Sequence, residues 1–219
     1  MRFAATLDRW PHHLRRPLGL LFPKGALPEP FARTGAIFVH IPKAAGSSVS
    51  EALFGCQVGH VAISELYAAN YSAARRCFKF TIVREPLDRL HSAFQFLQRG
   101  GINDNDRMFA EAHLRGLDFA AFVERLEREV ALREWWHFRT QRSFLCKTAK
   151  SNRIAVDFVG RFESLETDFA AICQRMGVKA ALPATNRTIG RTSVAEVDPS
   201  TAASVRRIYA CDYELLGYA

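Results

Sequence analysis

Three short runs of β-branched and aromatic residues, each followed by a segment of helical periodicity, constrain the fold of this chain more than any other feature. The runs are Ala36–Ile41, Phe78–Val83 and Val156–Phe162, and we predict that they form buried strands. Strands that alternate with helices form a parallel sheet with helices on both faces. We therefore expect a single α/β domain with a central parallel sheet over residues 36–219.

Helical patterns fill the segments between and after these strands. Over Leu87–Leu97, apolar residues recur at steps of three and four, which is the spacing of one helix face. Asp198-Pro199 is typical of the cap and first residue of a helix. We predict helices over Ser48–Phe54, Ser64–Cys77, Leu87–Leu97, Asp118–Leu126, Trp135–Leu145, Leu165–Met176 and Pro199 to about Tyr209.

Residues 1–35 differ in composition from the rest of the chain. They hold five of the nine prolines, and six lysines and arginines against two acidic residues. Because proline lacks a backbone donor and restricts the residue before it, we expect an irregular basic arm ahead of the domain.

The net charge and the cysteines limit the class of protein. A net charge of +8 favours anionic partners such as nucleotide phosphates, acidic polysaccharide, nucleic acid or anionic lipid. The five cysteines are scattered and never spaced as CxxC, which argues against a disulfide framework or a zinc site and favours a reducing compartment. No apolar run approaches the length of a membrane span. We therefore expect a soluble cytoplasmic protein.

The first chemical signal is the loop Pro42–Ser47, which lies between a predicted strand and a predicted helix. A loop in this place directs backbone N–H groups and the positive end of the helix dipole toward one point. Gly46 allows close approach of a phosphate, Lys43 adds a positive charge, and Ser47 and Ser48 add hydroxyl donors. The loop is therefore typical of phosphate binding. It departs from the Walker A pattern, in which a lysine directly follows the glycine.

The second signal is the segment Val83–Phe94, which begins where the second predicted strand ends. Arg84 lies at the carboxyl end of that strand, where ligands bind in open α/β sheets. Ser92 follows about two helical turns later and can face the strand end. A guanidinium and a hydroxyl so placed suit one phosphate group. The alternative role for Arg84 is an ion pair with Glu85 or Asp88.

Together, the two segments resemble the carbohydrate sulfotransferases that use 3′-phosphoadenosine 5′-phosphosulfate (PAPS), in the branch that contains heparan and chondroitin O-sulfotransferases and bacterial relatives. In that family, a strand–PKxxGTS–helix loop binds the 5′-phosphosulfate, and a VRxPxxRxxSxF/Y segment binds the 3′-phosphate. The resemblance extends over about Ile37–Tyr218, through Asp157–Phe169 and the terminal Tyr209–Tyr218. It implies a P-loop-like arrangement of the sheet.

The resemblance also assigns roles to individual residues. It implies that Arg84 and Ser92 bind the 3′-phosphate and that no metal is required. Ala44 stands where the family often has a hydroxyl residue, so one donor to the phosphosulfate is missing. The residues that the resemblance places at the phosphosulfate are Lys43, Ala44, Ala45, Gly46, Ser47 and Ser48.

Two histidines are candidates for the base that accepts the proton of the acceptor hydroxyl, a task that suits histidine because its pKa lies near neutral pH. His60 lies in a segment, Gly59–Leu66, that resembles the region in which family members place a catalytic histidine. His137 is the alternative.

The segment around His137 is aromatic and basic. Aromatic faces of Trp135–Phe138 would stack on sugar rings, while arginines would pair with carboxylates or sulfates. The alternative is that the tryptophans belong to the core and the arginines are solvated. As contacts to an acidic saccharide acceptor we predict Arg139, Gln141 and Arg142.

The sequence thus predicts sulfuryl transfer from PAPS to a carbohydrate hydroxyl by in-line displacement, with Lys43 stabilising the charge that develops on the leaving phosphate. The product would be adenosine 3′,5′-bisphosphate. A P-loop nucleotide kinase is the first alternative, but its acidic metal ligand would have to be Asp157, which lies inside a predicted strand. The second is a nucleic-acid-binding module, which needs a basic stripe with stacking aromatics. Since the charge here is dispersed apart from the arm, we expect no nucleic acid partner.

Overall fold

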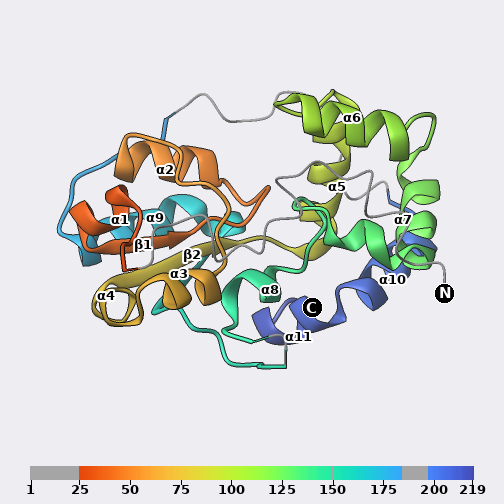
Figure 1. Cartoon of the computed structure of the whole chain (residues 1–219). Helices are drawn as coiled ribbons and strands as arrows, with labels where there is room; N and C mark the ends of the chain where they lie inside the picture. Colours follow the sequence, from red (N-terminus) through yellow and green to blue (C-terminus); the bar gives the residue numbers. More distant parts are fainter. Residues whose placement is uncertain (1–24, 149, 184–196) are drawn as a thin grey trace.

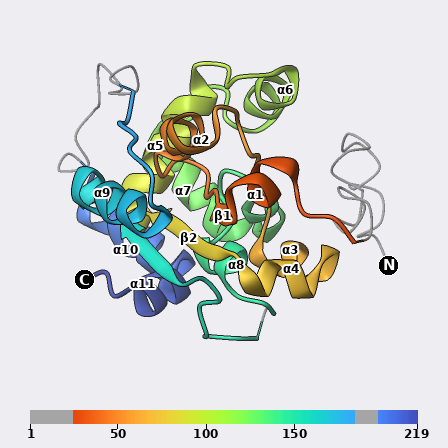
Figure 2. The same cartoon turned by 90° about the vertical axis from the view of Figure 1, so that its left-hand side faces the viewer.

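The computed structural model of the chain describes residues 25–148, 150–183 and 197–219. Within these ranges it contains a three-stranded parallel sheet in the order β1-β2-β3 (Figures 1 and 2). The prediction of an α/β domain with a central parallel sheet is confirmed, and each strand lies within a predicted run. The strands are β1 Ala36–Val39, β2 Phe78–Val83 and β3 Phe158–Arg161.

Aromatic side chains join the three strands. Phe38 pairs in register with Phe80, and Phe80 with Phe158. The rings of Phe38 and Phe80 are buried and stack with their centroids 5.1 Å apart. Because the strands are parallel, their carboxyl ends lie at one edge of the sheet, which is the edge where ligands bind in open α/β folds.

Helices cover both faces of the sheet. In Figures 1 and 2, α2 and α9 lie on one face, and α3, α4 and α8 lie on the other. The helix α1 packs beside β1. The bounds of these helices are α1 Glu29–Thr34, α2 Gly46–Phe54, α3 Ile63–Ala69, α4 Tyr71–Arg76, α8 Gln141–Leu145 and α9 Leu165–Met176.

A second group of helices continues beyond the carboxyl ends of the strands (Figure 1). It encloses its own apolar cluster, in which Phe94, Phe109, Phe122 and Phe138 are buried. The chain therefore has two packed parts, one around the sheet and one among these helices. The second group consists of α5 Pro86–Gln98, α6 Asp104–His113, α7 Phe119–Arg128, the 3₁₀ helix η4 Val130–Glu134, α10 Pro199–Ile208 and α11 Ala210–Leu216; a further 3₁₀ turn, η5 Phe162–Ser164, precedes α9.

Two of the predicted helices differ from the structure. The helix expected over Ser64–Cys77 is two helices, because the chain breaks at Asn70, whose side chain accepts a hydrogen bond from Ala73 N and caps α4. The helix expected over Trp135–Leu145 is wrong apart from its last turn, α8. Its first half is irregular because buried Arg89 donates to the carbonyl oxygens of His137 and Arg139, which are then not available to a helix.

The end of the proline-rich segment is more ordered than expected. Glu29–Thr34 forms α1. Phe31 is buried in the apolar cluster around the sheet, and Leu27 packs against the same cluster. The irregular conformation predicted for residues 1–35 therefore does not hold at α1, while residues 1–24 lie outside the described ranges. In the part of the chain that the structure describes, no helix is long and apolar enough to cross a bilayer.

Candidate active site

The residues between β1 and α2 form a tight loop. Lys43 and Ala45 have φ angles of 69° and 59°, a left-handed conformation that is unfavourable for residues other than glycine and persists only where the surroundings fix it. The helix α2 begins at the next residue, Gly46. The loop therefore turns the chain so that the amino end of α2, which carries a partial positive charge, borders a pocket.

Gly46 is required by the packing of this loop. A Cβ atom at Gly46 would lie 1.7 Å from Cδ2 and 1.9 Å from Nε2 of His40, far inside any van der Waals contact. The imidazole of His40, at the end of β1, is buried and occupies the space that a side chain at position 46 would fill. The sequence motif therefore needs its glycine for a second reason besides access of a ligand to the backbone.

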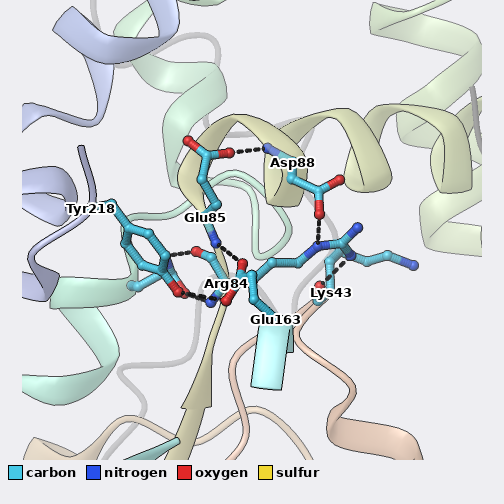
Figure 3. Close-up of polar contacts among 7 residues, drawn as sticks. Lys43, Arg84, Glu85, Asp88, Glu163 and Tyr218 are labelled. Carbon is cyan, nitrogen blue, oxygen red and sulfur yellow. Dashed lines mark hydrogen bonds and ion pairs between the residues drawn. The ribbon is translucent and has the colours of Figure 1, made fainter. Parts of the chain in front are cut away.

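Arg84 is fixed at the end of β2 (Figure 3). Its Nε donates to Oδ2 of Asp88 at 2.8 Å, and its Nη1 donates to the carbonyl oxygen of Lys43 at 2.9 Å. The guanidinium lies over the ring of Phe162. Its Nη2 is buried and has no hydrogen-bond partner among the described residues. The ion pair with Asp88, which was the alternative role for Arg84, is thus present, and it leaves the nitrogen Nη2 for a ligand.

A pocket of about 1140 Å³ opens at this edge of the sheet. One side comes from the loop after β1 and the amino end of α2, another from α5, and a third from the segment after β3. This volume is sufficient for a nucleotide with a second substrate. The residues that line the pocket are His40, Pro42, Lys43, Ala45, Gly46, Ser47, Ser48, His60, Arg84, Ser92, Phe96, Ile102, His137, Phe162, Glu163, Ser164, Leu165, Glu166, Thr167, Leu182 and Pro183.

The ammonium group of Lys43 lies over the ring of Phe96, with Nζ 3.9 Å from the ring centroid. The pKa of Lys43 is lowered to about 8, mainly by burial; the charge of Asp106 raises it and the charge of Arg99 lowers it, and the value of about 8 includes both. A lysine that is partly desolvated in this way gains charge stabilisation when an anion binds beside it.

His60 is held by the backbone of His40, the residue that follows β1. Its Nδ1 lies 3.0 Å from the carbonyl oxygen of His40, and because a carbonyl oxygen only accepts, Nδ1 carries the proton in the neutral ring. Nε2 of His60 is then the nitrogen with the lone pair. Burial lowers the pKa of His60 to about 4, so the ring is neutral at physiological pH and able to accept a proton.

His137 is enclosed more tightly than His60. Its Nε2 lies 3.2 Å from Oδ1 of Asp106, and its Nδ1 is buried, with no hydrogen-bond partner among the described residues. Although burial acts in the opposite direction, the hydrogen bond and charge of His137 lower the pKa of Asp106. Nε2 of His137 is thus engaged by Asp106, whereas the hydrogen bond of His60 to the backbone uses its Nδ1 and leaves its Nε2 without that constraint.

The pocket brings most of the predicted site residues together. Lys43, Ala45, Gly46, Ser47, Ser48, Arg84 and Ser92 all line it, as do both candidate bases. Ala44 does not line it, because its side chain is buried in the core around the sheet. The two motifs, which lie about 40 residues apart in the sequence, therefore border one pocket.

The residues predicted to contact the acceptor do not line the pocket. Gln141 is fully buried and bonds to the backbone of Arg84. Arg142 donates from Nε to the carbonyl oxygen of Ser151, and Arg139 lies beside Trp136 and Phe144. Trp135 and Phe138 are buried in the second apolar cluster. The faces of Trp135 and Phe138 are therefore not available to stack on a sugar, because these two rings fill the core, as the alternative interpretation expected.

Sequence reasoning missed three residues of this region. Asp106 lies in α6, a helix whose apolar residues show no long periodic stripe, and no sequence signal marks it. Phe96 lies in a helix that was predicted, but the pattern gave it no role. Glu163 lines the pocket and accepts hydrogen bonds from Glu85 N and the hydroxyl of Tyr218 (Figure 3). The loop geometry that brings these residues together is not encoded in local patterns.

A model of the sulfotransferase family matches residues 32–219. The chain belongs to the sulfotransferase family. No curated protein and no solved structure matches it significantly. The family match covers both motifs and every residue that lines the pocket, so the pocket at the carboxyl edge of the sheet is the candidate site of sulfuryl transfer. Among the described residues, no group of three or more histidine, cysteine or carboxylate side chains is placed to hold a metal ion.

Proposed function

We propose that this sulfotransferase moves a sulfuryl group from PAPS to a hydroxyl group of a carbohydrate. The observation that carries the proposal is Arg84, which lines the same pocket as Lys43 and the amino end of α2 and whose buried Nη2 has no hydrogen-bond partner in the part of the chain that the structure describes. A buried cationic donor without a partner costs free energy unless a ligand binds it. Two separate sources of positive potential suit a nucleotide that carries two anionic groups.

The chain's own residues suit such a donor. Arg84 and Ser92 would hold the 3′-phosphate, while Lys43, the backbone of Gly46–Ser48 and the hydroxyls of Ser47 and Ser48 would hold the 5′-phosphosulfate. Gly46 has no side chain of its own, and the space that a Cβ atom would take is filled by the ring of His40. When bound, PAPS supplies an activated bond between sulfur and the bridging phosphate oxygen.

His60 would act as the general base. Its Nε2 accepts the proton of the acceptor hydroxyl, and its Nδ1–H remains bonded to His40, which holds the ring in place. Lys43 and the amino end of α2 stabilise the negative charge that develops on the leaving phosphate oxygen. Electrostatic stabilisation is most effective when such groups are held in place before the reaction, and the hydrogen bond between His60 and His40 supports this for the base.

The carbohydrate class of the acceptor rests on the resemblance of the two motifs to carbohydrate sulfotransferases. Phe96 and Ile102 in the pocket wall offer apolar surface that suits the C–H face of a sugar ring. An acidic saccharide stays a prediction that rests on the net charge of +8, since Arg139 and Arg142 do not line the pocket.

The nucleotide test separates this proposal from a kinase. Adenosine 3′,5′-bisphosphate should bind more tightly than AMP by calorimetry, and Arg84→Ala should weaken its binding at least about tenfold, the scale of one charge-assisted hydrogen bond. Arg128→Ala, which removes an exposed arginine paired with Glu124 on α7, is the matched control and should bind as the wild type does. Equal affinity of the wild type for the two nucleotides would rule the proposal out.

A further inference from the structure

Gln141 binds the backbone of Arg84 with both ends of its side-chain amide. The N–H of Arg84 donates to Oε1 of Gln141 at 3.0 Å, and Nε2 of Gln141 donates to the carbonyl oxygen of Arg84 at 2.7 Å. Both residues are buried. This pair of bonds resembles the exchange between two neighbouring strands. It extends the fixed part of β2 by one residue, to Arg84.

Gln141 is itself held in place by the C-terminal helix. Asp212, in α11, is fully buried; its Oδ2 accepts from Gln141 N at 2.7 Å and its Oδ1 accepts from Arg142 N at 2.8 Å. A carboxylate that accepts two backbone N–H groups fixes the start of α8 in direction as well as position. A continuous chain of hydrogen bonds thus runs from Asp212 through Gln141 to Arg84.

A second set of bonds fixes the residue after Arg84 (Figure 3). Glu85 N donates to Oε1 of Glu163 at 2.7 Å, and Oε2 of Glu163 accepts from the hydroxyl of Tyr218 at 3.1 Å. The hydroxyl of Tyr213, in α11, donates to the carboxylate of Glu85. Hydrogen bonds from the C-terminal segment therefore fix both Arg84 and Glu85 at the carboxyl end of β2, although that segment lies about 130 residues away in the sequence.

We infer that Gln141 and Asp212 are positioning residues for Arg84 and through it set the preference of this enzyme for a nucleotide with a 3′-phosphate. This inference rests on the proposed function. Only one nitrogen of the Arg84 guanidinium, Nη2, has no hydrogen-bond partner among the described residues, since Asp88 and the Lys43 carbonyl bind the other two nitrogens. The N–H groups of Nη2 bind a ligand well only if the direction of the guanidinium is fixed. The backbone of Arg84 is the anchor of that side chain, and Gln141 holds this backbone on both sides.

The test compares affinities for adenosine 3′,5′-bisphosphate and AMP in variants of the full chain. Gln141→Met keeps the length of the side chain and removes both hydrogen bonds to Arg84. We expect it to lower the ratio of the two affinities about tenfold, because a small displacement of a ligand-binding group has effects of this order or larger. The affinity for AMP, which lacks the 3′-phosphate, should stay close to that of the wild type.

Asp212→Asn is the second variant. An amide offers only one oxygen to the two N–H groups of Gln141 and Arg142, so one of them loses its acceptor. The ratio of the two affinities should fall, as in Gln141→Met. Because Asp212→Asn leaves the side-chain volume unchanged, it provides the test if Gln141→Met does not fold. Tyr209→Phe is the matched control, since it removes a buried hydrogen bond of the same C-terminal region, from the Tyr209 hydroxyl to the Phe138 carbonyl, without contact to Arg84. It should lower the melting temperature but leave the affinity ratio unchanged.

The outcomes separate the inference from the proposed function. If the wild type itself binds the two nucleotides equally, the proposed function fails. If the wild type prefers the 3′-phosphate, and folded Gln141→Met and Asp212→Asn keep that preference in full, the proposed function stands and the positioning role of Gln141 and Asp212 is wrong. A ratio that falls equally in Tyr209→Phe would also overturn the inference, because the effect would then follow stability alone.

Discussion

Nδ1 of His60 lies 3.0 Å from the carbonyl oxygen of His40, and this contact fixes the tautomer of the candidate base. The same residue, His40, packs its ring against the backbone of Gly46. One residue at the end of β1 thus orients the histidine that would accept the proton and also shapes the loop that would bind the donor. The catalytic and binding parts of the site are therefore coupled through His40.

Replacing His60 should affect turnover far more than binding. His60→Ala removes the proton acceptor, and we expect turnover to fall by about 100- to 10,000-fold, the usual range for the loss of a general base. The affinity for adenosine 3′,5′-bisphosphate should remain nearly that of the wild type. Steady-state kinetics and calorimetry on one preparation test both parts. If His60→Ala stays fully active while His137→Ala loses activity, the assignment of the base is wrong.

Acid should destabilise the fold through His60. Its pKa is about 4 in the folded protein, against an ordinary value of 6.5, so the unfolded chain binds this proton more readily. The stability that the neutral ring contributes is therefore full above about pH 6.5 and is lost as the pH falls toward 4. Between pH 7.5 and 5, chemical denaturation should show a loss of about 2 kcal/mol from this residue.

His60→Gln provides the comparison, because it removes the titrating group. Buried His40, whose pKa is also lowered by burial, contributes in the same direction and remains in both proteins. The slope of unfolding free energy against pH should therefore be shallower in His60→Gln than in the wild type, but not zero. An identical slope in the two proteins would show that His60 is not held neutral in the folded state.

Nucleotide binding should weaken above about pH 8. The pKa of Lys43 in the free protein is about 8, and only the charged form attracts the phosphosulfate. As the pH rises above this value, protonation of Lys43 must accompany binding, and the dissociation constant should rise toward about tenfold per pH unit. Lys43→Met should bind the nucleotide more weakly than the wild type, and its dissociation constant should not show this rise above pH 8. A dissociation constant that is constant from pH 7 to 10 in the wild type would contradict the role of Lys43.

The contact between Gly46 and His40 predicts a rescue. Gly46→Ala places a Cβ atom inside the His40 ring, and we expect a loss of stability of about 3 kcal/mol or more, at the upper end of overpacking effects. His40→Ala alone opens a cavity and costs less. The double variant should be more stable than Gly46→Ala, since the smaller side chain leaves room for the added methyl. Additive losses in a double-mutant cycle would show that the two positions do not interact.

Much of this fold could be predicted from local patterns. The strand Phe78–Val83 has the predicted bounds because its run of β-branched and aromatic residues is ended by Arg84-Glu85-Pro86. The helix Leu165–Met176 also has its predicted bounds, because Gly177 adopts a left-handed conformation that ends it. In both cases the signal that ends the element lies next to it in the sequence.

The rest depends on contacts between distant segments. Trp135–Phe138 looked like a helix and a binding surface, but Arg89 binds the carbonyl oxygens of His137 and Arg139, and the aromatic rings fill a core. Gln141 looked like an acceptor contact, but it lies behind Arg84. A polar residue that hydrogen-bonds to other residues looks the same in the local sequence as one that binds a ligand. Only the folded structure distinguishes the two.

Transfer of ³⁵S from labelled PAPS to a panel of polysaccharides, with excess EDTA present, is the direct test of the proposed reaction. We expect labelled polysaccharide, together with adenosine 3′,5′-bisphosphate in equal amount. In Lys43→Ala, both products should fall by about 100-fold or more, the effect of removing one preorganised charge. Transfer of phosphate from ATP in the presence of magnesium, with no transfer of label from PAPS to any acceptor, would contradict the proposed reaction.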